Sequence, residues 1–119
     1  MTTHAAERRA AVRIRPIDEL PSRARLVEGE RRIELRVLDV SVGGFAVAGD
    51  PELRAEEGRE LRVELDLGRF GKFEVLGVIR HCAEEPSGAV GVQIVDPRRE
   101  VTGALGRYIA ELLERGASS

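Results

Sequence analysis

The chain has 119 residues, of which 42% are hydrophobic, and its formal net charge is −2. A chain of this length can bury one hydrophobic core, so we expect a single compact domain. It contains no run of about 18 apolar residues and no apolar stretch typical of a secretory signal, which favours a cytoplasmic protein. The single cysteine, Cys82, excludes an internal disulfide, and Cys82 with His4 and His81 offers no zinc-site spacing. We therefore expect neither a structural metal nor a cofactor.

Charge is distributed unevenly along the chain. Residues 1–25 contain six arginines and three acidic residues, so this segment carries +3 and the remainder carries −5. A basic segment on an acidic body favours a local anionic partner over the broad basic face that nucleic-acid polymers require.

Residues 1–19 show no sustained period of two or 3.6 residues, and Pro16 and Pro21 discourage regular structure near their end. This composition predicts a flexible basic arm over 1–19, followed by a folded domain over 20–116. Alternating apolar residues and turn formers predict six strands in that domain, the first two joined as a hairpin at Gly29. The predicted strands are 22–28, 32–40, 45–48, 61–67, 72–82 and 89–95. Short strands at hairpin spacing predict a small antiparallel barrel or sandwich.

The C-terminal segment changes to a helical period. Its apolar residues fall on one helical face: Val101, Leu105, Tyr108, Ile109 and Leu112. Asp96 is predicted as the N-cap with Pro97 in the first helical position, and Gly116 is predicted to end the helix. The apolar face is expected to pack on the barrel, with a partner or dimer face as the alternative.

Two short motifs stand out. Arg9 and Arg13, with Arg8 directly before them, form an R-x-x-x-R pattern in the arm. About 25 residues later, a predicted strand ends in Asp39-Val40-Ser41-Val42-Gly43-Gly44. Taken alone, this second motif is also consistent with an ordinary hairpin turn, because Asp and Ser bond nearby backbone amides and glycine permits positive φ.

The two motifs together, followed by short strands and a terminal helix, resemble the PilZ family. The resemblance covers nearly the whole chain and includes residues 91–94, although relatives often have phenylalanine where Ile94 stands. It implies a six-stranded antiparallel barrel with a C-terminal helix, and cyclic di-GMP as a ligand held between the arm and the barrel. Because no second domain is seen in the sequence, we expect a stand-alone receptor that acts as an adaptor and signals to an effector protein.

By this resemblance, the cyclic di-GMP site would contain Arg8, Arg9, Arg13, Asp39, Ser41, Gly43 and Gly44. Arginine suits such a ligand, because its planar fork binds phosphate or the O6/N7 edge of guanine. Asp39 would accept from guanine or orient an arginine, Ser41 would donate to a phosphate, and Gly44 would let backbone approach the ligand. Arg8 would favour a stacked pair of ligand molecules.

Other functions are less consistent with the sequence. An enzyme would depend on Ser41, Asp39 and His81, but Asp39 and Ser41 share one turn and no nucleophile elbow surrounds Ser41. His81 and Cys82 are interpreted as ordinary strand residues with neighbours facing opposite ways, and Cys82 as a small buried hydrophobe. A single-strand nucleic-acid binder would need more stacking aromatics than three phenylalanines and one tyrosine.

A PilZ-like interaction module that has lost its ligand remains the main alternative, and a homodimer remains possible. If the ligand binds, residues 1–19 are expected to be mobile without it and ordered over it. The reason is that Arg8, Arg9 and Arg13 repel one another until anions compensate them.

Overall fold

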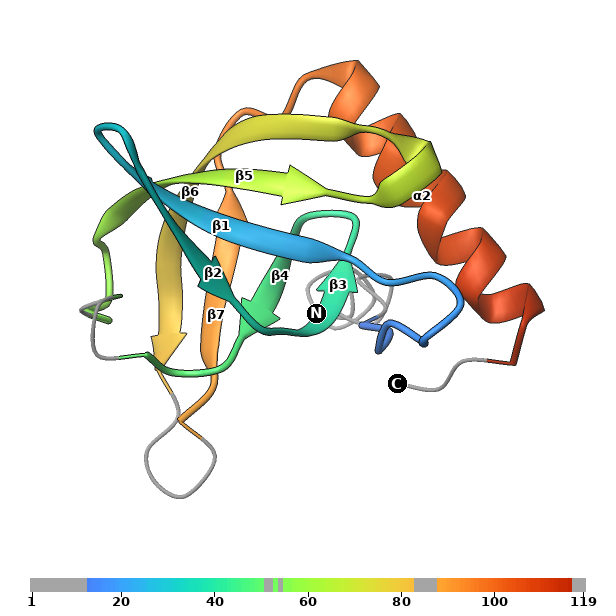
Figure 1. The fold of residues 1–119 in the computed structure, drawn as a ribbon, viewed down its shortest axis with the longest axis horizontal. Coiled ribbons are helices and arrows are strands. Elements are labelled where there is room, and N and C mark those ends of the chain that lie inside the picture. Colours follow the sequence, from blue (N-terminus) through green and yellow to red (C-terminus); the bar gives the residue numbers. More distant parts are fainter. Residues whose placement is uncertain (1–12, 51–52, 54, 83–87, 117–119) are drawn as a thin grey trace, which may run out of the picture.

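The computed structural model describes residues 13–50, 53, 55–82 and 88–116. In chain order the elements are β1 (Arg23–Glu28), β2 (Arg31–Leu35), β3 (Val37–Ser41), β4 (Gly44–Val47), β5 (Glu60–Asp66), the 3-10 turn η2 (Gly68–Phe70), β6 (Lys72–Cys82), β7 (Val90–Ile94) and helix α2 (Arg99–Glu114). Figure 1 shows one strongly bent sheet with α2 lying against it.

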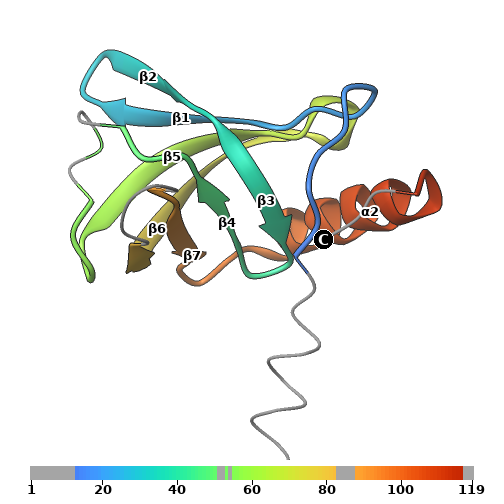
Figure 2. The same cartoon turned by 90° about the horizontal axis from the view of Figure 1, so that it is seen from below.

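The strands form a single antiparallel sheet in the order β2-β1-β5-β6-β7-β4-β3. The sheet curls so that the β1–β2 hairpin and the β3–β4 hairpin face each other across the interior (Figure 2). Alternate residues of β5 point inward and are almost fully buried, as its sequence period predicts: Leu61, Val63 and Leu65. The predicted antiparallel β fold with a C-terminal helix is therefore confirmed.

The number of strands differs from the prediction. Residues 32–40 were expected to form one strand, but the chain bends at Arg36 and yields β2 and β3, which lie at opposite edges of the sheet. The carbonyl of Arg36 accepts a hydrogen bond of 2.9 Å from the amide of Ala48, which lies just beyond β4. The apolar alternation of Ile33, Leu35 and Val37 continues through Arg36 and hid the bend, because period alone does not reveal where a strand changes neighbours.

The segment just before β1 is packed onto the domain. Ile14 is 2% exposed, and its amide and carbonyl each form a 2.9 Å hydrogen bond with Val40 of β3. Leu20 is also buried, and its amide donates to the carbonyl of Ile17. Ile14 and Ile17 belong to the predicted arm, and Leu20 lies directly after it. Their packing was not predicted, because isolated apolar residues without a period give no strand signal.

Helix α2 begins later than predicted. Asp96 has a φ of 46°, a left-handed conformation, and its side chain caps no helix. The helix starts after Arg98, whose carbonyl accepts hydrogen bonds from Val101 and Thr102. Asp96 instead turns the chain out of β7, so the predicted cap was wrong. The predicted end is correct, since α2 stops at Glu114 and Gly116 has a φ of 83°.

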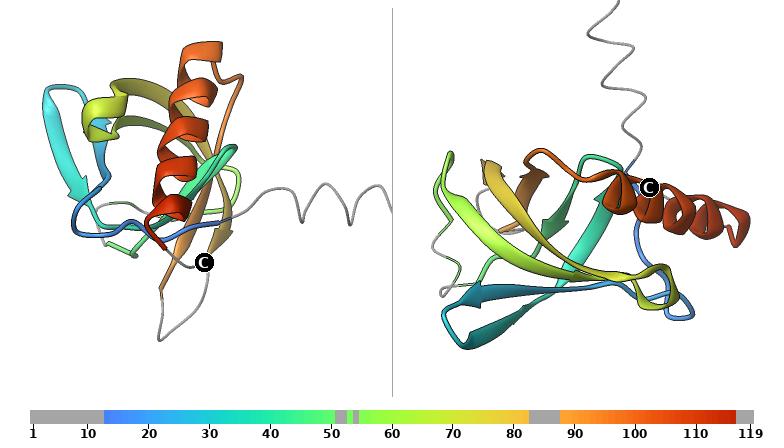
Figure 3. Two further views of the ribbon diagram at one scale, coloured as in Figure 1. Left: turned by 90° about the vertical axis from the view of Figure 1, so that its right-hand side faces the viewer. Right: turned by 90° about the horizontal axis from the view of Figure 1, so that it is seen from above.

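The apolar face of α2 packs on the barrel, as predicted. Its buried residues are Val101, Ala104, Leu105, Tyr108, Ile109 and Leu112. The helix contacts β3 and η2 (Figure 3), and the Phe70 and Tyr108 rings meet edge to face at 5.8 Å. Within the described ranges, no helix is both long and apolar enough to cross a membrane.

Candidate functional site

The polar residues of β3 face outward because of a bulge. The register between β3 and β4 shifts between Val37 and Asp39, after which buried Val40 lies opposite buried Phe45. In a strand without this bulge, Asp39 would have the same orientation as Val37, two residues before it, and would point toward the core. The bulge thus places Asp39 and Ser41 together on the outer face of the sheet.

Arg13 lies beside this face and is held by Asp39. The Nε of Arg13 donates to Oδ1 of Asp39 at 3.1 Å, although the two residues are 26 positions apart. The backbone pairing of Ile14 with Val40 sets this approach, since it fixes the preceding residue next to β3. The Arg13 side chain is 55% exposed, so its remaining guanidinium donors stay accessible.

The turn from β3 to β4 is closed by its own polar groups. The Ser41 hydroxyl donates to the carbonyl of Gly44 at 3.3 Å, and the amide of Ile94 donates to the carbonyl of Gly43 at 2.9 Å. Neither Gly43 nor Gly44 has a positive φ. Gly44 is required by close packing instead, because a Cβ there would lie 2.1 Å from the Val92 carbonyl oxygen.

A second bulge aims two residues of β6 at the same face. The register between β6 and β7 shifts between Ile79 and His81, so Arg80 is the extra residue. Buried Ile79 faces buried Val92, while His81 lies opposite Gly91, and both Arg80 and His81 are exposed. The expectation that neighbours of His81 face opposite ways fails here because a bulge interrupts the alternation.

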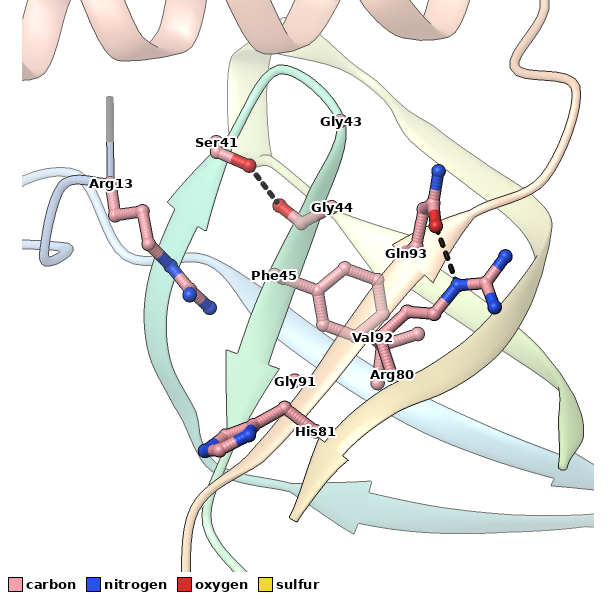
Figure 4. A pocket seen from close by; sticks show the side chains of 10 residues that line it. All are labelled: Arg13, Ser41, Gly43, Gly44, Phe45, Arg80, His81, Gly91, Val92 and Gln93. Carbon is pink, nitrogen blue, oxygen red and sulfur yellow. Dashed lines mark hydrogen bonds between the residues drawn. The ribbon is translucent and has the colours of Figure 1, made fainter. Parts of the chain in front are cut away.

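These elements surround an open pocket of about 260 Å³. Figure 4 shows the residues that line it: Arg13, Ser41, Gly43, Gly44, Phe45, Arg80, His81, Gly91, Val92 and Gln93. None of these ten residues is acidic. The pocket therefore combines two guanidinium groups and an imidazole with three glycines, where no side chain covers the backbone. This combination suits an anionic ligand rich in hydrogen-bond acceptors.

Of the residues proposed from sequence, Arg13, Ser41, Gly43 and Gly44 line the pocket, and Asp39 supports it through Arg13. Arg8 and Arg9 lie outside the described residues. Six lining residues were not predicted from the sequence: Phe45, Arg80, His81, Gly91, Val92 and Gln93. Only the exposed Gln93 between buried Val92 and Ile94 carried a signal, as a polar position on the outer face of β7.

The arrangement does not form a catalytic relay. Ser41 donates to a backbone carbonyl and Asp39 accepts from Arg13, so neither is hydrogen-bonded to His81 in the described chain. Free Cys82 is partly buried and packs against the hydrophobic core. Among the residues that the structure covers, no group of three or more His, Cys, Asp or Glu is placed to hold a metal ion.

A bent antiparallel sheet with an arginine-lined pocket on its outer face is typical of a ligand-binding module. The family model for the PilZ domain matches residues 7–111, so the chain belongs to the PilZ family. PilZ domains are non-catalytic modules that bind cyclic di-GMP. A comparison with curated protein sequences found no match.

Solved structures support the fold. The PilZ domain of YcgR from Escherichia coli with c-di-GMP has a TM-score of 0.69 at 18% identity, with coverage of 91% of this chain and 93% of that one. The inhibitor of motility MotI/DgrA from Bacillus subtilis has a TM-score of 0.70 at 23% identity, and the K. pneumonia MrkH–c-di-GMP complex 0.69 at 18%. These two matches cover 91% and 87% of this chain, which spans only 52% of MotI/DgrA and 50% of MrkH.

Proposed function

We propose that this chain binds cyclic di-GMP in the pocket between Arg13 and the Asp39–Gly44 turn. The observation that carries the proposal is the 3.1 Å contact between Arg13 and Asp39, which joins the two family motifs at one edge of an open pocket. YcgR and MrkH, which share the fold, are described in complex with c-di-GMP.

The chemistry of the pocket matches this ligand. Cyclic di-GMP carries two phosphodiester charges and two guanines, each with O6 and N7 acceptors on one edge. The Nε of Arg13 is used by Asp39, which leaves its terminal NH groups to bind phosphate or base. Ser41 can turn its hydroxyl from the Gly44 carbonyl to a phosphate oxygen, since the present 3.3 Å bond is long.

The arm supplies the signal in this proposal. Arg8 and Arg9 precede Arg13, which is anchored by its neighbour Ile14, so a ligand at Arg13 lies within reach of both. Bound phosphates would compensate the mutual repulsion of these arginines and allow residues 5–12 to order over the ligand. Such ordering changes the surface beside the Asp39–Gly44 turn and offers an effector protein a difference to recognise.

The binding site is tested by calorimetry with cyclic di-GMP. Arg13→Ala is expected to weaken binding by about 1.5 to 3 kcal/mol, because a charged contact is lost. Arg62→Ala is the matched control. Arg62 is an exposed arginine of strand β5, which lies next to β6, and it forms an ion pair with Glu74 outside the pocket. Circular dichroism verifies that both variants fold. If Arg13→Ala binds cyclic di-GMP with wild-type affinity, the proposed site is wrong. If the wild-type protein does not bind cyclic di-GMP, the alternative of a PilZ-like interaction module without this ligand is favoured.

The signalling step is tested by hydrogen exchange. Amides of residues 5–12 should exchange fast in the free protein and slow when cyclic di-GMP saturates it. The amide of Ile14 serves as an internal reference, because it is already hydrogen-bonded to Val40. Protection over residues 5–12 before ligand is added, or none at saturation, would contradict the mechanism.

A further inference from the structure

We propose that Arg80, held by Gln93, binds the O6/N7 edge of one guanine and so makes the site selective for guanine over adenine. This inference rests on the proposed function, because it assigns a role within the same pocket. Neither residue belongs to the two sequence motifs, and both reach the pocket from the strands β6 and β7.

The position of Arg80 follows from the bulge in β6. Arg80 is the extra residue between the pairs Ile79–Val92 and His81–Gly91, and it projects from the outer face beside Gln93. Bulges often re-aim side chains next to functional sites. Gly91, opposite His81, has no side chain to cover this part of the face.

The Arg80 guanidinium is oriented before any ligand binds. Its Nε donates to Oε1 of Gln93 at 2.7 Å, which fixes the plane of the group. The two terminal nitrogens form no ion pair within the described residues, so the outer edge of the fork is available. Because Oε1 of Gln93 accepts this bond, the amide nitrogen of Gln93 adds further donors at the same place.

Such a cluster of donors discriminates between bases. Guanine offers two acceptors, O6 and N7, at a spacing that an arginine fork binds with two parallel hydrogen bonds. Adenine offers N7 but places a donor amino group at the position of O6, which would face the donors of Arg80. Lysine cannot reproduce this geometry, because its ammonium is a point charge.

The pocket layout separates Arg80 from the motif residues. Arg13 lies beside β3, whereas Arg80 stands on β6, with β7 and β4 between them (Figure 4). The terminal nitrogen of Arg13 reaches toward β7, where a Cβ on Gly91 would lie 3.9 Å from it, so the two guanidinium groups enter the pocket from opposite sides. Arg80 is therefore assigned to a base that extends from the phosphates bound near Arg13 and Ser41.

The test combines protein and ligand changes. Wild type, Arg80→Ala and Arg80→Lys are titrated with cyclic di-GMP and with its 7-deazaguanine analogue, in which a CH group replaces N7. For the wild type, loss of N7 should reduce affinity about tenfold. For both variants, affinity for cyclic di-GMP should itself fall about tenfold, and the analogue should bind no more weakly than the natural ligand. Arg62→Lys, the matched control, should retain the wild-type dependence on N7.

Each outcome separates this role from the proposed function. If the wild type does not bind cyclic di-GMP, the proposed function fails and this inference fails with it. If the wild type binds but Arg80→Lys keeps the tenfold dependence on N7, or if the wild type never shows it, only the role of Arg80 is overturned. Because Arg80 is exposed, neither substitution removes a core contact.

Discussion

Gly44 shows how a motif residue can be required by packing. Gly43 and Gly44 are adjacent in the same turn, and neither has a positive φ. A Cβ on Gly43 would meet nothing within 4 Å, whereas one on Gly44 would meet the Val92 carbonyl oxygen at 2.1 Å. At this position backbone approaches backbone, so the neighbour cannot simply rotate away.

We therefore predict that Gly44→Ala destabilises the fold and that Gly43→Ala does not. The first substitution forces β4 and β7 apart and should lower the free energy of unfolding by about 1 to 3 kcal/mol, as overpacking does. The second should change it by no more than about 0.5 kcal/mol, as at other surface positions. Urea unfolding of the two variants measures both values. Equal stabilities would show that close packing against Val92 does not explain the glycine.

At the scale of elements, Tyr108 ties helix α2 to the segment that leads into β1. Its hydroxyl donates to the carbonyl of Leu20 at 2.6 Å, and its side chain is fully buried. Burial raises the pKa of Tyr108 above its ordinary value of 10.0, because the phenolate is disfavoured away from water. The neighbouring Ser22 hydroxyl lowers the pKa of Tyr108, but by less than burial raises it. The Ser22 hydroxyl itself forms no hydrogen bond with the described residues.

This raised pKa predicts a loss of stability at alkaline pH. Above pH 10 the unfolded chain releases the Tyr108 proton more readily than the folded one, so the free energy of unfolding falls as pH rises toward the folded pKa. Tyr108→Phe removes this dependence and, below pH 9, costs about 0.5 to 1.5 kcal/mol for the lost hydrogen bond. Urea unfolding from pH 8 to 11 compares the two proteins. Parallel curves across that range would contradict the prediction.

At the scale of the whole molecule, the proposed ligand binding would be linked to folding. The pocket is built from the segment around Arg13 and from β3, β4, β6 and β7, which meet only in the folded state. A ligand that binds this assembled pocket and not the unfolded chain stabilises the fold by mass action.

We predict that cyclic di-GMP at about 100 times its Kd raises the melting temperature by about 10 °C, which corresponds to about 2.7 kcal/mol. Because the proposed contacts are ionic, Kd should rise with salt, so the shift at the same ligand concentration should shrink between low and high sodium chloride. Thermal melts followed by circular dichroism measure it. Arg13→Ala should lose most of the shift, and a salt-independent shift would argue against ionic recognition.

Much of the architecture could be predicted from the sequence by itself. The alternation in residues 61–67 and the helical period from Val101 to Leu112 follow from local burial patterns, and the structure confirms both elements. The family resemblance also named Arg13, Asp39, Ser41 and the two glycines, and the structure brings these residues together. These features can be recognised in the sequence because each depends on residue types at short, regular spacing.

Only the tertiary structure decided which side chains complete the pocket. The bulges at β3 and β6, the bend at Arg36 and the burial of Ile14 all depend on which strand lies alongside. A shift of one residue turns a side chain from the core to the surface, and the sequence of one strand does not determine the register of its partner. From the sequence, Arg80 and His81 are therefore indistinguishable from ordinary strand residues. Their pairing with β7, where Gly91 lies opposite His81, brings them to the pocket.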